Sequence, residues 1–187
     1  MRRITVRRVR GVSLIEVLVA MLVVSFGVLA LSGLMAAASR LGKTSEFRAV
    51  ATLLASDMAD RMRANKLGVN NGAYELLNAY EPPSDEPPDP VACAKKTECS
   101  PAELAAQDLA EWNQALYHSL PSAQGYVAAD GSQTPPVAAD IWVAWLDPKA
   151  SENEDAFGSD SGSHQECPPG FRDKDPQPRC LYFRVSL

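Results

Sequence analysis

The first 81 residues of the chain contain no proline and no cysteine, and the first ten contain no acidic residue. Because proline interrupts helices, its absence permits one long uninterrupted helix in this half. All 14 prolines and all 4 cysteines lie in the remainder, which predicts a loop-rich globular region there. We therefore expect two physically different halves.

Basic residues are scarce outside the N-terminus. Of the 18 lysines and arginines, five lie in the leader: Arg2, Arg3, Arg7, Arg8 and Arg10. The rest of the chain has 13 basic against 23 acidic residues, a formal charge of -10. An acidic body argues against a nucleic-acid partner, which normally needs a basic surface.

Residues and motifs typical of catalysis are also few. The only histidines are His118 and His164, and the sequence has no CxxC, GxSxG or HExxH motif and no glycine-rich phosphate loop. The sequence therefore predicts no enzyme activity, no cofactor and no metal site. An exported hydrolase held by an uncleaved anchor is the weaker alternative.

A long apolar segment follows the basic leader. Residues 12–39 include a single charged side chain, Glu16, and about 20 apolar helical residues suffice to cross a bilayer. This length disfavours a cleaved secretory signal. The arginines on its N-terminal side predict a cytoplasmic N-terminus and an exported C-terminal body, in a single-pass membrane protein.

Glu16 is a costly residue in that segment. An ionised carboxylate facing lipid at depth costs on the order of 2.5 to 3.5 kcal/mol, so a partner is expected. The alternative is that Glu16 lies near the cytoplasmic interface and stays hydrated close to Arg8 and Arg10.

The arrangement of basic leader, Gly11, Val12, Ser-Leu-Ile, Glu16 and apolar helix resembles the type IV prepilin family. The resemblance implies cleavage between Gly11 and Val12 by prepilin peptidase and N-methylation of the new terminus. It also implies that Glu16 pairs with the amino terminus of a neighbouring subunit and so sets the register of packed helices. Mature pilins usually begin with phenylalanine or methionine, whereas this chain would begin with Val12.

An amphipathic segment, residues 40–66, continues the helix. Its apolar stripe has helical spacing and consists of Phe47, Ala51, Leu54, Met58 and Met62. Packing in the chain's own core is the main interpretation of this stripe, and packing against partner helices is the second. Asp57 and Arg61 are spaced for an i,i+4 ion pair on another face.

The exported region, residues 67–187, predicts a small α+β domain. After a proline-rich acidic connector, Ser100, Pro101 and Glu103 predict the capped start of a second helix that ends before Pro121. Strands are expected at residues 126–128, 141–146 and 181–187. The predicted fold is a long N-terminal helix packed on a small antiparallel sheet, with a second short helix and disulfide-closed loops.

The four cysteines would meet an oxidising compartment after export, which favours two disulfides. Three pairings are open, and the spacing favours the local pairs Cys93–Cys99 and Cys167–Cys180. Residues 147–179 predict a long acidic loop. Calcium binding around Asp155 and Asp160 is a weaker interpretation, because their spacing matches no EF-hand loop.

The chain also resembles the PilV type of minor pilin. This resemblance is carried by residues 57–65, the helix ending at Leu120-Pro121, the strand from Trp142 to Trp145 and the strand after Cys180. This resemblance implies a type IV pilin-like fold and a role, with other minor pilins and the major pilin, in priming pilus assembly near the tip. It implies movement from the inner membrane to the extracellular pilus. A minor pseudopilin of a type II secretion system is the alternative, and an adhesin or ligand-binding role at the tip is compatible with the first reading.

Overall fold

The computed structural model describes residues 11–81, 83, 85–87, 93, 98–132, 135–146 and 167–187. The basic leader and residues 147–166 of the expected acidic loop, with Asp155, Asp160 and His164, lie outside the described residues. The chain divides into two compact units, Met1–Lys43 and Thr44–Leu187. Helix α1 (Leu14–Ala64) contributes to both units, and every other element belongs to the second.

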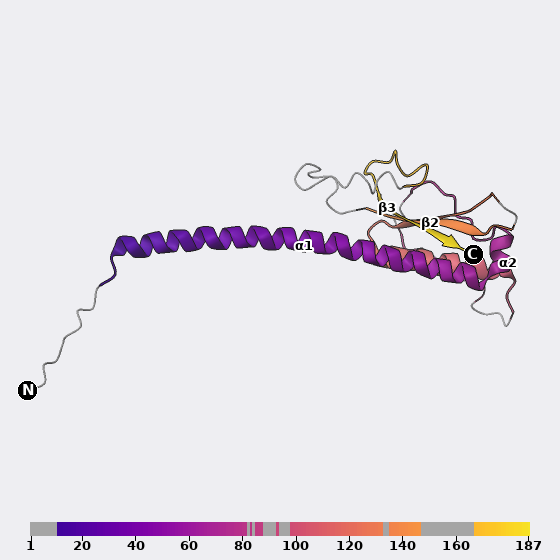
Figure 1. Ribbon diagram of the computed structural model, residues 1–187, viewed down its shortest axis with the longest axis horizontal. Coiled ribbons are helices and arrows are strands. Elements are labelled where there is room, and N and C mark those ends of the chain that lie inside the picture. The colour runs from indigo at the N-terminus through magenta and orange to yellow at the C-terminus, as the bar shows by residue number, and fades with distance from the viewer. Residues whose placement is uncertain are drawn as a thin grey trace, which may run out of the picture. The chain divides into compact units, whose positions relative to one another are not determined.

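Helix α1 is one continuous helix of 51 residues (Figure 1). It contains no proline, and Gly27, Gly33 and Gly42 lie within it without ending it. The sequence predicted a helix over residues 12–66, so the long helix is confirmed with ends two residues inside the expected bounds.

A very short helix that the sequence did not predict, α2 (Lys66–Asn70), follows directly. Asn65 separates the two helices: its Oδ1 accepts a hydrogen bond from the Gly68 N–H at 3.1 Å, and its Nδ2 donates to the Pro101 carbonyl at 2.7 Å. An asparagine side chain that bonds to backbone groups competes with helix continuation, so α1 ends here.

Helix α3 (Pro101–Ser119) begins with the predicted capping box. Ser100 Oγ accepts a hydrogen bond from the Glu103 N–H at 3.3 Å, and the Glu103 carboxylate accepts one from the Ser100 N–H at 3.0 Å. Two N–H groups at the helix start thereby gain partners. The helix ends at Ser119, before Pro121, as predicted.

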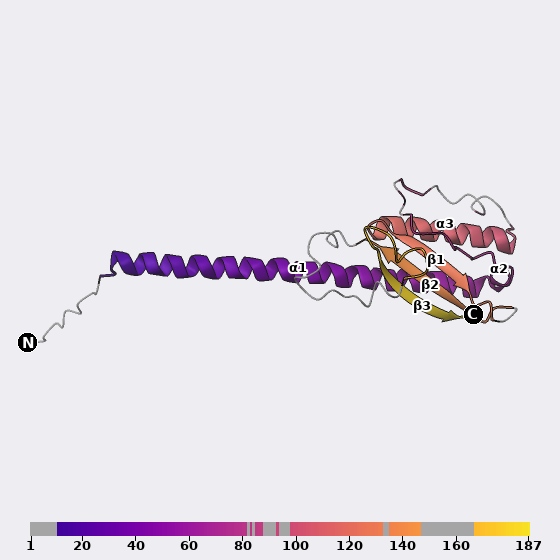
Figure 2. The ribbon, with the colours of Figure 1, turned by 90° about the horizontal axis from the view of Figure 1, so that it is seen from above.

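Three antiparallel strands form one sheet in the order β1-β2-β3 (Figure 2). They are β1 (Gln124–Ala129), β2 (Ala138–Trp145) and β3 (Arg179–Ser186), close to the predicted ranges. Tyr126 lies opposite Trp142, which in turn lies opposite Tyr182. An isolated bridge between Leu76 and Val127 adds one further contact on the free side of β1.

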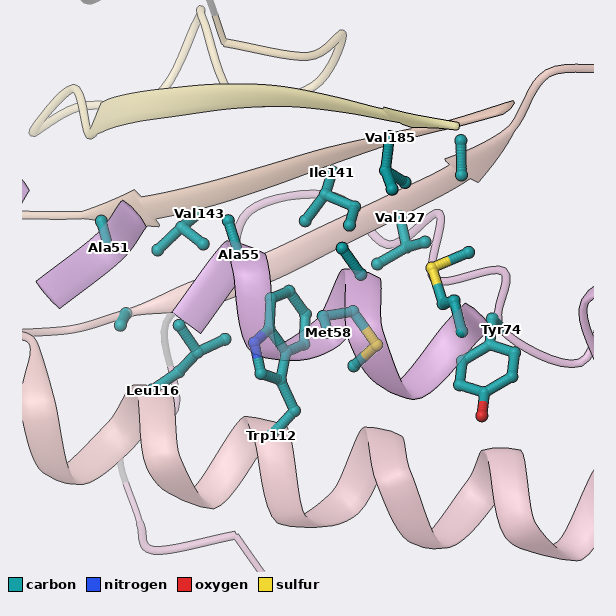
Figure 3. Packing of buried hydrophobic residues seen from close by; sticks show 14 of the residues in the cluster. Ala51, Ala55, Met58, Tyr74, Trp112, Leu116, Val127, Ile141, Val143 and Val185 are labelled. Carbon is teal, nitrogen blue, oxygen red and sulfur yellow. The ribbon is translucent and has the colours of Figure 1, made fainter. Parts of the chain in front are cut away.

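The main core lies between the sheet, α3 and the last part of α1. Figure 3 shows side chains of all three elements meeting there: Ala51, Ala55, Met58, Trp112, Leu116, Val127, Ile141, Val143 and Val185. The indole N–H of Trp112 donates to the Leu54 carbonyl at 2.8 Å, so this buried ring also satisfies its polar atom. The α+β arrangement of a helix packed on an antiparallel sheet is confirmed.

A smaller core covers part of the other face of the sheet. It consists of Tyr80, Ala144, Cys167, Phe171 and Cys180, and the Cys167–Cys180 disulfide closes the loop that carries Phe171. The other disulfide joins Cys93 to Cys99, just before the start of α3. Both bridges are local, and the expectation of disulfide-closed loops is confirmed.

The proline-rich connector lies along α3 where it is described. His118 Nε2 is 2.9 Å from Glu86 Oε1, and Gln114 donates to the Pro87 carbonyl at 3.4 Å. The backbone N–H of Cys93 donates to Gln107 at 3.3 Å. His118 is exposed and helps to hold this connector.

Candidate functional site

At the start of α1, an exposed backbone segment leads directly into the first hydrogen-bonded turn of the helix. Gly11, Val12 and Ser13 precede the helix and are exposed. Among the described residues, no atom beyond the chain neighbours of Gly11 lies within 4 Å of the position that a Cβ would take there. The Ser13 carbonyl accepts hydrogen bonds from the N–H groups of Glu16, at 3.0 Å, and Val17, at 3.3 Å. The Gly11–Val12 peptide bond therefore lies in accessible chain directly before a rigid helix.

Glu16 lies in the first turn of α1. A carboxylate is favoured at this end of a helix, because the unpaired N–H groups there carry partial positive charge. Around it lie Ala20, Met21 and Val24 of the same helix, and Val12 just before the helix. A carboxylate on an apolar helix face can be neutralised by an amine brought by another chain.

The surface of α1 in the first unit is apolar and exposed. Its exposed large side chains are Leu14, Ile15, Val17, Leu18, Val19, Met21, Leu22, Val23, Val24, Phe26, Val28, Leu29, Leu31, Leu34 and Met35. Ser25 and Ser32 donate to the carbonyls of Met21 and Val28, so these hydroxyls need no outside partner. This helix is long and apolar enough to cross a membrane.

The stripe of α1 in the second unit has a different environment. Ala51, Met58 and Met62 are buried in the core of this chain, and Phe47 and Leu54 are partly buried against it. These three buried side chains are covered by the sheet and α3, so the expectation that they pack against partner helices is wrong. Their burial agrees with the main interpretation of the stripe, which is packing in the chain's own core.

A polar cluster joins α1 to α3. Arg61 contacts Asp57 at 3.0 Å, the i,i+4 pair that the sequence predicted, and also Asp108 at 3.1 Å and Glu111 at 2.7 Å. Tyr74 donates a hydrogen bond to Asp108. Asp108 was not predicted from the sequence, although its spacing from Ala105 and Trp112 places it beside the buried face of α3.

The ionisation of the cluster follows from these contacts. Burial alone would lower the pKa of Arg61, but its hydrogen bonds to Glu111 and Asp57 and the charge of Asp57 raise that pKa above its ordinary value. Arg61 and Gln107 hold the pKa of Glu111 below its usual range. The pKa of Tyr74 is raised above its ordinary value, mainly by burial and secondly by the hydrogen bond to Asp108. Each charge is thus used in joining elements of the fold.

Metal binding has no support in the part of the chain that the structure describes, where no group of three or more His, Cys, Asp and Glu side chains could hold an ion. The exposed functional features are therefore the open Gly11–Val12 bond, Glu16 and the apolar surface of α1.

Two family models match consecutive parts of the chain. Residues 6–38 match the prokaryotic N-terminal methylation motif, and residues 37–110 match the Type IV pilin Tt1218 family. The first match contains Gly11, Val12 and Glu16, and the second contains the last part of α1, α2 and the start of α3. No curated protein and no solved structure matches the chain.

Proposed function

We propose that this chain, whose two matched segments are those of a type IV pilin, is a minor pilin that acts with other minor pilins to prime pilus assembly near the tip. The observation that carries the proposal is the continuous exposed apolar surface of α1 directly after Gly11 and Glu16. Such a surface needs either lipid or other helices to cover it.

The first step in this proposal is processing. Prepilin peptidase cuts between Gly11 and Val12 on the cytoplasmic side, and Val12 becomes the methylated amino terminus. Because the cut precedes α1, the helix remains as the membrane anchor, with the globular unit in the periplasm.

The second step is transfer from lipid to the filament. The exposed side chains of α1 exchange lipid for neighbouring pilin helices, and Glu16 pairs with the amino terminus of a neighbour. An unpaired carboxylate would be costly at any other stagger, so this pair selects the register.

The test is analysis of sheared pili from cells that express the full chain. Mass spectrometry is expected to find a methylated N-terminus at Val12 and far fewer copies than the major pilin. Deletion of the chain is expected to reduce surface pili and twitching while secretion of exoproteins continues. Recovery of an intact leader, or loss of secretion with normal piliation, would contradict the proposal, and the second result would favour the pseudopilin alternative.

A further inference from the structure

Strand β3 leaves one of its edges without a partner strand in the described part of the chain. The sheet order is β1-β2-β3, so β3 pairs only with β2, and Figure 2 shows it as the outermost strand on the side away from α3. The β2–β3 register continues from Ala138–Ser186 to Trp145–Arg179 with one residue opposite one residue throughout.

The hydrogen-bond pattern shows which groups point outward. The Leu187 N–H donates to the Val137 carbonyl at 2.9 Å, so odd-numbered residues of β3 direct their backbone groups toward β2. The backbone groups of Tyr182 and Arg184 therefore point away from the sheet. Among the described residues, the outward backbone groups of Tyr182 and Arg184 form no hydrogen bond. The Ser186 carbonyl differs, since it accepts a hydrogen bond from Arg63 at 3.2 Å.

Natural proteins usually protect open sheet edges, because the unpaired backbone groups of an edge can pair with a strand of another chain. Proline, bulges and charged side chains over the edge are the usual guards, and β3 contains neither proline nor a bulge. Its exposed charged residue, Arg184, is drawn back across the sheet: it contacts Asp140 on β2 at 2.9 Å and also Asp130. Tyr182 likewise donates to Asp140, at 2.7 Å.

The inner face at this edge is apolar and incompletely covered. Leu181 and Phe183 point inward from β3 and are only partly buried against the main core. An added strand with alternating apolar residues would continue the sheet and cover the rest of both side chains. The outward backbone N–H and C=O groups of β3 repeat at the spacing found along a strand. The ligand that matches this spacing is another extended polypeptide backbone.

We propose that the edge of β3 from Tyr182 to Arg184 is a strand-addition site that binds an extended segment of a neighbouring pilin subunit. Backbone hydrogen bonds to Tyr182 and Arg184 hold the segment, and its apolar residues pack on Leu181 and Phe183. The identity of the partner as a pilin subunit rests on the proposed function; the open edge itself does not.

The experiment compares Tyr182→Pro with Tyr182→Ala in the full chain. Both variants lose the same aromatic side chain, but only proline removes the outward N–H, and proline is tolerated where that group does not serve the native ladder. Recovery of the proline variant in sheared pili is expected to fall about fivefold or more below that of the alanine variant, the effect of one net hydrogen bond of typical strength. Thermal unfolding of both variants, purified in detergent, serves as the folding control.

A second measurement covers the case in which the proline variant does not fold. A photocrosslinking amino acid at Tyr182 is expected to join the chain to one pilin subunit in intact cells, and the same amino acid at exposed Ser119 on α3 is the control. Equal recovery of folded Tyr182→Pro and Tyr182→Ala, or equal crosslinking from both positions, would overturn the inference. If the wild-type chain itself is missing from sheared pili, the proposed function fails instead.

Discussion

The indole ring of Trp112 on α3 lies so close to Gly125 on β1 that a Cβ added to Gly125 would stand 2.0 Å from Trp112 Cζ3. Trp112 is fully buried at the centre of the main core and is held by its hydrogen bond to the Leu54 carbonyl. The ring therefore has no room to withdraw, and the backbone of β1 can pass it only as glycine.

Replacement of Gly125 by alanine is expected to lower the free energy of unfolding by about 1 to 3 kcal/mol, because it overpacks this contact. Thermal unfolding of the full chain in detergent measures the change. Gly131→Ala is the matched control: in the described part of the chain no atom beyond its chain neighbours lies within 4 Å of its Cβ position, so a change below about 0.5 kcal/mol is expected. Equal effects of the two substitutions would mean that the contact is not tight.

The Arg61–Glu111 contact predicts a pH dependence of stability. Because Arg61 and Gln107 depress the pKa of Glu111, the folded protein binds this proton less readily than the unfolded chain. The stabilisation is complete above the unfolded pKa of about 4.3 and is lost as the pH falls through the folded value. Urea unfolding between pH 6 and pH 3 is expected to show that the deficit of Glu111→Gln relative to wild type shrinks on acidification.

Arg61→Ala provides the control for that experiment. Without the guanidinium, the Glu111→Gln substitution is expected to add little pH-dependent loss, because the main cause of the depressed pKa has gone. If the double variant keeps the full pH-dependent difference, Arg61 is not the partner that matters.

The two disulfides are expected to differ in their contributions. Cys167 and Cys180 are buried, 13 residues apart, and join the Phe171 loop to β3, so replacing both by serine is expected to cost about 2 to 4 kcal/mol. Cys93 and Cys99 are partly exposed and only 6 residues apart. Their replacement is expected to cost less, as measured by thermal unfolding of each double variant. A larger loss from the shorter loop would contradict this order.

Glu16→Ala is expected to leave membrane insertion unchanged but to reduce recovery in sheared pili, because it removes the charge that we propose to pair with a neighbour's amino terminus. Glu16→Gln keeps the shape without the charge and is expected to behave in the same way. Glu75→Gln, at an exposed position of the second unit, controls for loss of a carboxylate. Wild-type recovery of both Glu16 variants would favour a hydrated interfacial position for Glu16.

Local features of the fold could be predicted well from the sequence. The absence of proline predicted a continuous helix, and Ser100 and Glu103 predicted the start of α3. Alternating residues predicted β2 and β3, and a turn signal after residue 128 predicted β1. Each signal depends on neighbours within a few residues along the chain. The short helix α2 was missed because Asn65 ends α1 through a bond to Pro101, which is distant in sequence.

The candidate site shows the same division. Gly11, Val12 and Glu16 belong to one contiguous motif, and their spacing along the chain already indicated the motif that the family model matches. The stripe from Phe47 to Met62 had two possible uses, and spacing alone could not choose between them. The sheet and α3 cover its central residues, so packing inside the chain takes precedence.

The sequence by itself determined the apolar helix, its single carboxylate and the open bond before it, because these depend on composition and order alone. Only the tertiary structure decided which apolar residues remain exposed, that Asp108 and Arg61 meet, and that β3 is the last strand of the sheet formed by the described residues. Burial and strand order arise from contacts between segments far apart in the chain, and no local pattern specifies those contacts.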